Sequence, residues 1–139
     1  MAGEHMLEAE VLTPEGPVFK GELFQLSTRT AVGEVGIRAR HAPILARLVP
    51  AELRLHPSEG GEVERYAQGE GWLEVFANRA RVLIAEAIPP DDLDSGELRE
   101  RLEEANRRLE EAEEGTAARE RAEREKRRFE AFLQIAEGT

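Results

Sequence analysis

The stretch ARVLIAEAIPPDDLDSGELRERLEEANRRLE, residues 80–110, contains the boundary that decides the fold. Before Pro89 and Pro90 the apolar residues come at strand-like spacing, and after Pro90 they return every three or four positions, as in an amphipathic helix. Charge changes at the same place, because residues 1–90 carry 22 Asp, Glu, Lys and Arg side chains and the much shorter segment 91–139 carries 26. We therefore expect two domains, 1–90 and 91–139.

The first domain is predicted to consist of short strands. Apolar residues alternate with charged or polar ones around Leu7–Val11 and again around Leu53 and Leu55, which indicates half-buried strands. Later apolar runs are separated by turn residues, and a hairpin turn is expected at residues 59–62. These runs are Val63–Ala67, Trp72–Phe76 and Ala80–Ala85. Short strands at this spacing favour a sandwich or flattened barrel, and we expect Trp72 to lie in its core.

The second domain is predicted to be an antiparallel helical hairpin. Asp94 and Glu97 have the spacing of a capping box, and Gly115 with Thr116 can end one helix and cap the next. Two helical stripes of apolar residues follow from this division. The first stripe is Leu98, Leu102, Ala105, Leu109 and Ala112, and the second is Ala118, Ala122, Phe129, Leu133 and Ala136.

Packing of this hairpin is predicted to be uneven. Folding the chain about Gly115 places Leu98 near Phe129 and Phe132 at the base, whereas Leu109 near the tip faces mainly Ala, Glu and Arg. Large buried side chains contribute roughly 1.5–3 kcal/mol each and alanines much less. We therefore expect an anchored base and a weakly held tip.

Charge is divided unequally between the two predicted helices. Residues 91–114 carry 11 acidic and 4 basic side chains, whereas residues 117–128 carry 6 basic and 3 acidic ones. The second helix could lie against the acidic first helix, or it could present its basic residues to an acidic surface elsewhere. A solvated, salt-bridged helix pair is the simpler interpretation. The basic residues are Arg119, Arg121, Arg124, Lys126, Arg127 and Arg128.

Composition argues against several classes of function. The absence of cysteine excludes thiol catalysis and disulfides, and the net charge of -10 argues against binding to nucleic acid or anionic lipid. No stretch approaches the roughly 20 apolar residues that span a bilayer, and residues 1–10 do not resemble a signal peptide. We expect a soluble cytoplasmic protein with protein partners, no nucleic-acid partner and no direct insertion into a membrane.

Catalytic motifs are not found. His5, His41 and His56 lie far apart in the sequence, and the motifs of serine hydrolases, zinc proteases and nucleotide-binding loops are missing. Asp91, Asp92 and Asp94 could hold a divalent cation, but they lack the ligand spacing of a calcium loop and fit better as acids at a helix start. The sequence predicts a non-catalytic protein, with a free-standing adaptor and an enzyme of scattered site residues as the competing classes.

One segment is more specific than the rest. It reads Gly33-Glu34-Val35-Gly36-Ile37 and continues to His41-Ala42-Pro43-Ile44-Leu45. The glycines allow a tight bend, and Pro43 favours an extended loop around His41. An exposed loop with a positioned polar residue is a candidate contact site, and a plain connection between strands is the alternative.

The segment resembles the ε subunit of F-type ATP synthases, called δ in mitochondria, whose members carry Gly-Glu-x-Gly-Ile followed by His-Ala-Pro-x-Leu. A second block agrees in order and spacing: Gly71-Trp72-Leu73-Glu74-Val75 is similar to the family's Gly-Phe-Leu-Glu-Val. Asn78 with Val82-Leu83 resembles the Asn-x-Val-x-Val-Leu strand that follows. The resemblance continues through Leu93-Asp94 into the hairpin and so covers essentially the whole chain.

The resemblance implies an α+β fold, with an N-terminal ten-strand β-sandwich and a C-terminal two-helix hairpin. It implies a non-catalytic central-stalk subunit that couples proton transport to ATP synthesis, peripheral at the cytoplasmic face of the cell membrane. The implied partners are the γ subunit, the c-ring, and the α and β subunits. Carried over by position, Glu34, Arg38, Arg40 and His41 would contact the c-ring, and Arg119–Arg128 would reach an acidic region of β and inhibit ATP hydrolysis.

Two departures from the family pattern limit this transfer. The chain has Arg38-Ala39-Arg40 where the family commonly has Leu-Pro-Gly, which changes the shape and charge of the loop. Some bacterial members bind ATP at the folded hairpin through Ile/Leu-Asp-x-x-Arg-Ala and an acidic residue six positions before the Asp. This chain has Glu97, Leu98 and Ile88 at the three decisive positions. Because a carboxylate repels phosphate, we expect weak or no ATP binding and no other cofactor.

Overall fold

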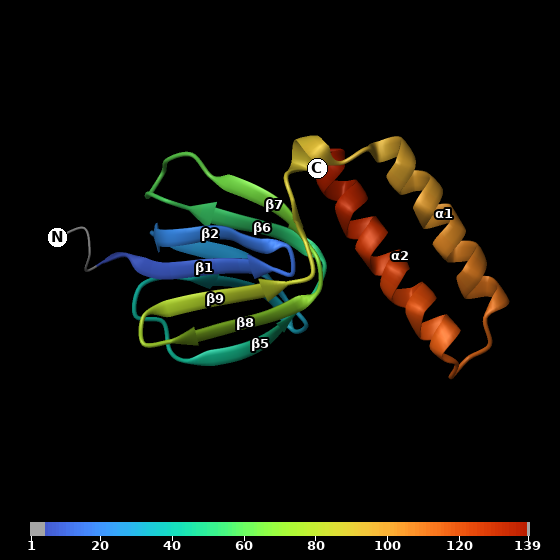
Figure 1. The fold of residues 1–139 in the computed structure, drawn as a ribbon, viewed down its shortest axis with the longest axis horizontal. Helices are drawn as coiled ribbons and strands as arrows, with labels where there is room; N and C mark the ends of the chain where they lie inside the picture. Colours follow the sequence, from blue (N-terminus) through green and yellow to red (C-terminus); the bar gives the residue numbers. More distant parts are fainter. Residues whose placement is uncertain (1–4, 139) are drawn as a thin grey trace. The chain divides into compact units, whose positions relative to one another are not determined.

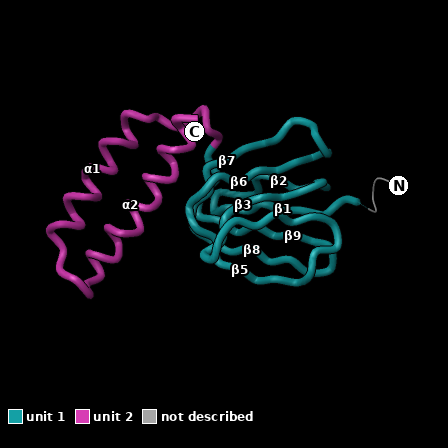
Figure 2. The backbone as a smooth tube through the Cα atoms, turned by 180° about the vertical axis from the view of Figure 1, so that it is seen from behind, with its two compact units in different colours: residues 1–88 teal, residues 89–139 magenta. Residues whose placement is uncertain are grey.

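The computed structural model describes residues 5–138. The chain divides after Ile88 into two compact units, a β-sheet unit and a helical unit, shown in teal and magenta in Figure 2.

Within the described residues, the first unit contains ten strands joined in one hydrogen-bonded sheet that folds into two layers (Figure 1). The order across the sheet is β10-β7-β6-β3-β5-β8-β9-β1-β2, and β4 pairs with β3. All pairs are antiparallel except β1 with β9. The strands are β1 (Leu7–Thr13), β2 (Gly16–Leu23), β3 (Gln25–Thr30), β4 (Gly33–Ile37), β5 (Ile44–Leu48), β6 (Ala51–His56), β7 (Glu64–Gln68), β8 (Gly71–Phe76), β9 (Arg79–Ile84) and β10 (Ala87–Ile88).

The core of the sandwich follows the period of two that the sequence predicts. In β1, Leu7, Ala9 and Val11 are buried while Glu8 is exposed, and in β6 Leu53 and Leu55 are fully buried. The ten-strand sandwich followed by two helices is therefore confirmed. The predicted runs Val63–Ala67 and Ala80–Ala85 are each displaced by one residue from β7 and β9.

Two expectations for this unit are wrong. Trp72 lies on the outer face of β8 with half of its surface exposed, because Leu73 and Val75 occupy the inward positions and alternation directs Trp72 outward. Gly33–Ile37 forms the regular strand β4 rather than a bend. The chain turns just before it, and Gly33 leaves that turn with a φ of 136°.

The helical unit consists of a short 3-10 turn, η2 (Pro90–Asp92), and the helices α1 (Ser95–Glu111) and α2 (Ala117–Ala136). Asp94 caps α1 by accepting a hydrogen bond from the backbone N–H of Glu97 at 3.1 Å. The Glu97 side chain does not complete the capping box, because its Oε1 accepts from Arg101 Nε at 3.0 Å. Thr116 caps α2 as expected by accepting from the backbone N–H of Arg119.

The first helix ends four residues before the predicted stop. Glu111 is its last residue, and Ala112 is extended, so Gly115 lies in the connection with a φ of 77°. Buried residues on the facing stripes are Leu98 and Ala105 on α1 and Ala122, Phe129 and Phe132 on α2. Leu109 is only partly buried. No helix among residues 5–138 is long and apolar enough to cross a membrane.

Candidate functional site

The loop of residues 38–43 joins β4 to β5 at one end of the sandwich. β9 starts beside this loop and runs toward the opposite end, where the chain continues into β10 (Figure 1). Arg38 and Arg40 are exposed, and His41 is half-buried. The loop is closed by a hydrogen bond from the His41 backbone N–H to the Arg38 carbonyl oxygen at 3.2 Å. Three predicted contact residues therefore share one ordered loop.

Asn78 positions this loop, a role that the sequence analysis missed. Its Oδ1 accepts from the backbone N–H of Arg40 at 2.8 Å, and its Nδ2 donates to the Met6 carbonyl oxygen at 3.0 Å. Arg40 has a φ of 63°, a conformation that favours glycine, and it occupies the position of the family's glycine. The Asn78 side chain holds the backbone there in that conformation.

Glu34 is not brought together with the loop residues. It is the second residue of β4, and the loop follows the last residue, Ile37, about 10 Å further along the strand. Glu34 instead pairs across the strands with Arg29, with 3.3 Å between Oε1 and Nη2. Both side chains are more than half exposed. The four predicted c-ring contacts thus form one group of three and one separate carboxylate.

Four large apolar side chains lie on the outer face of β5, β8 and β9, where the charged residues Arg47 and Glu74 lie among them. Leu45, Trp72, Phe76 and Leu83 are 70%, 50%, 67% and 42% exposed, and they are four of the five exposed large hydrophobic residues among residues 5–138. Trp72 lies directly opposite Leu83 across the two strands. Leu45 and Phe76 line one shallow depression together with Pro43 and Glu74. We call these four residues the β5–β8–β9 patch.

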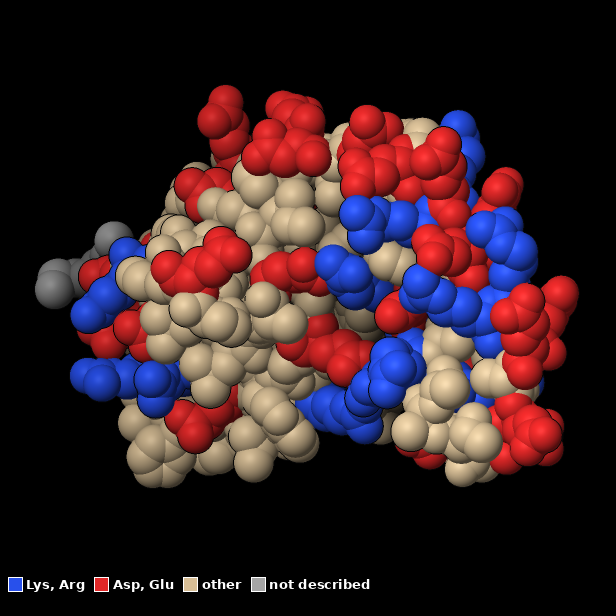
Figure 3. Space-filling model, turned by 45° about the vertical axis from the view of Figure 1, so that its right-hand side comes forward, with Lys and Arg blue, Asp and Glu red and all other residues tan. Residues whose placement is uncertain are grey.

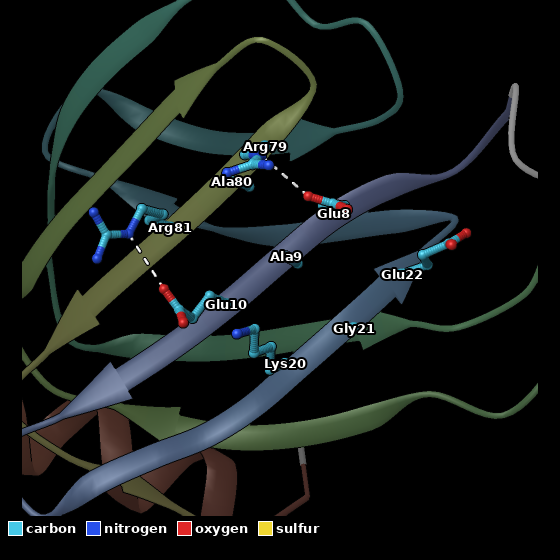
Figure 4. A pocket seen from close by; sticks show the side chains of 9 residues that line it. All are labelled: Glu8, Ala9, Glu10, Lys20, Gly21, Glu22, Arg79, Ala80 and Arg81. Carbon is cyan, nitrogen blue, oxygen red and sulfur yellow. Dashed lines mark hydrogen bonds and ion pairs between the residues drawn. The ribbon is translucent and has the colours of Figure 1, made fainter.

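Next to the patch, the outer face of β9, β1 and β2 is a ladder of charges. Arg79 Nε lies 3.1 Å from Glu8 Oε2, and Arg81 Nε lies 3.3 Å from Glu10 Oε1, as the dashed lines in Figure 4 show. These are cross-strand pairs between parallel neighbours. They border an open depression that Lys20 and Glu22 also line. The arrangement gives the apolar patch a polar border.

The net charges of the two helices suggest ion pairs between acidic residues of α1 and basic residues of α2. The ion pairs between the helices instead join arginines of α1 to glutamates of the second helical segment. Arg108 on α1 pairs with Glu125 on α2 at 3.2 Å, and Arg99 on α1 pairs with Glu137 beyond the end of α2. The basic residues of α1 thus contact the acidic residues of α2. The interpretation as a salt-bridged pair fits, but among the described residues no acidic side chain of α1 pairs with Arg121, Arg124 or Arg127.

The six basic residues of α2 separate into three kinds. Arg128 lies over the rings of Phe129 and Phe132, with its Cζ 5.1 Å and 5.3 Å from the ring centres. Arg119 is used inside the hairpin, and Lys126 is partly buried. Arg121, Arg124 and Arg127 are exposed, are spaced three residues apart and make no ion pair within the described part of the chain. We call these three residues the arginine ridge. Figure 3 shows basic and acidic side chains mixed over the visible face of the helical unit.

Arg119 holds the tip of the hairpin, which is more firmly closed than the apolar pattern indicates. Its Nη1 donates to the carbonyl oxygens of Leu109 and Ala112 at 3.0 Å and 3.2 Å. These carbonyl groups lie at the C-terminal end of α1 and lack helical partners. The guanidinium group supplies the missing hydrogen bonds, and its positive charge interacts favourably with the negative end of the helix dipole. Glu123 lies 3.4 Å from Arg119 Nε. The second helix therefore caps the first.

Replacing Arg119 should loosen the tip. Hydrogen bonds from a charged donor contribute roughly 1.5–3 kcal/mol, and partial exposure places this pair at the lower end. In Arg119→Ala, amide hydrogens of residues 109–119 should exchange about tenfold faster than in the unmodified chain. Arg121→Ala, an arginine substitution on the same helix without these contacts, should leave the rates unchanged. Equal rates in the two variants would show that Arg119 does not hold the tip.

No metal-binding group is formed by the described residues. Within residues 5–138, no three His, Asp or Glu side chains are placed to hold a metal ion. Asp94 is the N-cap of α1, in keeping with the interpretation of Asp91, Asp92 and Asp94 as acids at a helix start. The features that remain are an ordered loop, an apolar patch and an arginine ridge, all of them suited to contact with other proteins.

Comparison with known proteins identifies the family. The model of the β-sandwich domain of the ATP synthase delta/epsilon chain matches residues 6–90. The ATP synthase epsilon chain of Persephonella marina is 39% identical over 132 residues, covering 94% of this chain and 96% of the relative. The epsilon chain of Sulfurihydrogenibium sp. is 32% identical over 131 residues, covering 94% and 97%.

Solved structures show the same fold. A chain in the cryo-EM structure of the Euglena gracilis mitochondrial ATP synthase, comprising OSCP, F1 and the c-ring, superimposes with a TM-score of 0.79 at 24% identity, covering 91% of this chain and 78% of the other. A chain of the Tetrahymena thermophila central stalk and c-ring gives a TM-score of 0.60 at 19% identity, covering 93% and 95%. From its sequence relatives, the chain belongs to the ATP synthase epsilon chain family, as a non-catalytic subunit of that complex.

Proposed function

We propose that this chain works in the central stalk of an ATP synthase, where it couples proton transport to ATP synthesis and restrains ATP hydrolysis. The sandwich docks on the γ subunit, its 38–43 loop meets the c-ring, and the hairpin reaches the α and β subunits. Family membership supports the assignment to the complex. The chemistry of each surface supports the partner assigned to it.

The β5–β8–β9 patch is the observation that carries the docking proposal. Several exposed large apolar residues on one face are typical of protein–protein contact, because their burial removes apolar surface from water. A tryptophan and a phenylalanine are present in the patch, and aromatic residues dominate binding energy at interfaces. The charged ladder of β9, β1 and β2 forms a polar rim beside them. We assign this face to the γ subunit.

A charge placed in the patch tests this assignment. Trp72→Glu should weaken binding to a complex of α, β and γ at least about tenfold, because the carboxylate would be buried without a partner. Val32→Glu is the matched control, since Val32 is 97% exposed in the β3–β4 turn, outside the patch. It should bind like the unmodified chain. Equal affinity of both variants, measured by surface plasmon resonance, would place the docking face elsewhere.

The loop of residues 38–43 supports the proposed contact with the c-ring. Arg38 and Arg40 present positive charge, and hydrogen bonds to Asn78 and within the loop limit its freedom. A preorganised loop binds at a smaller entropic cost than a flexible one. Glu34, which lies away from this loop, would contribute a separate contact. With a c-ring partner, we propose that the chain lies peripherally at the cytoplasmic face of the cell membrane.

The arginine ridge supports the proposed inhibition. Arg121, Arg124 and Arg127 are available on the surface of α2 while the hairpin is closed, because α1 is not paired with them. Arginine suits such a contact, since its guanidinium binds carboxylates in a bidentate way. An acidic region of the β subunit is the proposed partner, and opening of the tip would require release of Arg119 from α1.

We also propose that the hairpin does not hold ATP. Glu97 places a carboxylate at the start of α1 and is paired with Arg101, and Asp94 is engaged as the N-cap. Ile88 supplies no acidic group. Micromolar affinity for ATP in isothermal titration calorimetry would contradict this part of the proposal.

A further inference from the structure

We propose that the outer face of β6 binds a small oxyanion, with inorganic phosphate as the simplest ligand of this class, between the side chains of Arg54 and His56. Both residues point away from the core, because Leu53 and Leu55 take the inward positions of the strand. The site lies within the sandwich, on a different strand from those of the β5–β8–β9 patch. It is separate from the β5–β8–β9 patch and from the arginine ridge, and it shares Arg38 with the 38–43 loop.

Two nitrogen atoms carry this inference. Among the described residues, Arg54 Nε and His56 Nε2 are the buried side-chain polar atoms for which the protein supplies no hydrogen-bond partner. Buried polar groups are nearly always paired, since an unpaired one loses its hydration without compensation. The two residues are neighbours on one face of one strand. Arg54 Nε–H is a donor, and His56 becomes a second donor when Nε2 is protonated, so both residues offer a donor to an acceptor on this face of the strand.

A further guanidinium group is held in place beside His56. Arg38 donates from Nε to Gln25 Oε1 at 2.8 Å, and its Cζ lies 4.7 Å above the centre of the Phe24 ring. Gln25 is the cross-strand partner of His56, and the backbone N–H of Phe24 donates to the His56 carbonyl oxygen. Arg38 is thus oriented by the two residues that adjoin His56, and its charge is fixed near the site before any ligand arrives.

On the other side, Arg65 lies directly opposite Arg54 across β6 and β7. Like charges in this position repel each other. Glu52 relieves this repulsion incompletely, because its Oε1 lies 3.1 Å from Arg65 Nη1 and 3.9 Å from Arg54 Nη1. One carboxylate therefore serves two guanidinium groups, with Arg54 the more weakly paired. An oxyanion would offset the remaining positive charge.

The ionisation of His56 is affected by the same charges. Burial lowers its pKa, and repulsion from Arg54, Arg65 and Arg38 lowers it further. These arginines act on the imidazole from β6, from β7 and from the segment after β4. An oxyanion bound among them favours the protonated ring, which would also donate from Nε2. Binding of phosphate should therefore raise the pKa of His56, and lower pH should strengthen binding.

The test is an NMR titration of His56 in the full-length chain, with phosphate or chloride at equal ionic strength. In chloride the pKa of His56 should lie below that of an ordinary histidine. In phosphate it should rise, while the titration of His5, which is exposed and outside the site, serves as the reference in the same spectra. Arg54→Gln should abolish the phosphate-dependent rise and weaken phosphate binding at least about tenfold, as expected for a lost charge-assisted hydrogen bond.

Arg47→Gln, an exposed strand arginine on β5, is the matched control and should keep the full response. Arg65→Gln provides a second variant of the site, so that a folding defect in Arg54→Gln does not decide the result. An unchanged pKa of His56 in phosphate, in a folded chain, overturns the proposal, because water then suffices for the two nitrogen atoms. An equal change at His5 also overturns it, since the effect is then a general one of the anion.

Discussion

Gly71→Ala is expected to lower the free energy of unfolding of the sandwich by about 3 kcal/mol or more, near the upper end of overpacking effects. A Cβ at this position would stand 1.9 Å from the carbonyl oxygen of Leu83 and 2.8 Å from the Cα of Ile84. Both atoms belong to the backbone of β9, so no side-chain rotation can relieve the clash. The strand pair β8–β9 would have to separate locally, which also disturbs the core residue Leu73.

Thermal unfolding provides the measurement, and the midpoint of the sandwich should fall by about 12 °C or more. Gly21→Ala is the matched control, because a Cβ there meets the Phe19 ring at 3.5 Å, an ordinary contact. It should be neutral or slightly stabilising, since alanine restricts the unfolded chain more than glycine does. Similar midpoints for the two variants would mean that β8 and β9 are not packed as closely as the structure shows.

Removal of residues 91–139 is expected to raise the ATP hydrolysis rate of a reconstituted α, β, γ complex at least about fivefold. Regulatory coupling free energies of roughly 1–3 kcal/mol correspond to about 5–150-fold changes in affinity, and we expect a change in rate at the lower limit of that range. The truncated chain keeps the β5–β8–β9 patch and should still bind the complex. Loss of inhibition with retained binding would therefore be attributable to the hairpin.

Substitution of the arginine ridge tests which part of the hairpin causes the inhibition. The combined substitutions Arg121→Gln, Arg124→Gln and Arg127→Gln should raise the hydrolysis rate about as much as truncation does, and the hairpin should stay folded because these side chains are exposed. Arg107→Gln, an exposed arginine of α1, is the control and should leave inhibition intact. If the full-length, ridge-substituted and truncated chains all bind and give the same rate, the hairpin is not inhibitory.

Much of this fold could be predicted from local sequence signals. The change of apolar period after Pro90 separated strands from helices, and the caps Asp94 and Thr116 lie where their spacing indicates. Alternation also predicted the buried residues of β1 and β6. These signals succeed because each depends on neighbours within a few residues of the chain.

The rest depended on contacts between distant segments. Trp72 is the exception, because local alternation with Leu73 and Val75 already places it on the outward face with Glu74, and the expectation of a core position disregarded that signal. Net charge cannot reveal which individual side chains face each other, so the pairing of Arg108 with Glu125 was not predicted. The Asn78 contact with Arg40 spans 38 residues, and no local pattern indicates it.

Trp72 also provides the most direct test of the central claim, that the sandwich docks on an ATP synthase stalk through the β5–β8–β9 patch. It is the single tryptophan of the chain, so labelling with 5-fluorotryptophan gives one fluorine signal from the patch itself. Titration with an unlabelled α, β, γ complex should shift and broaden this signal, with saturation at one chain per complex. A fluorine signal that stays unchanged throughout the titration would contradict the account.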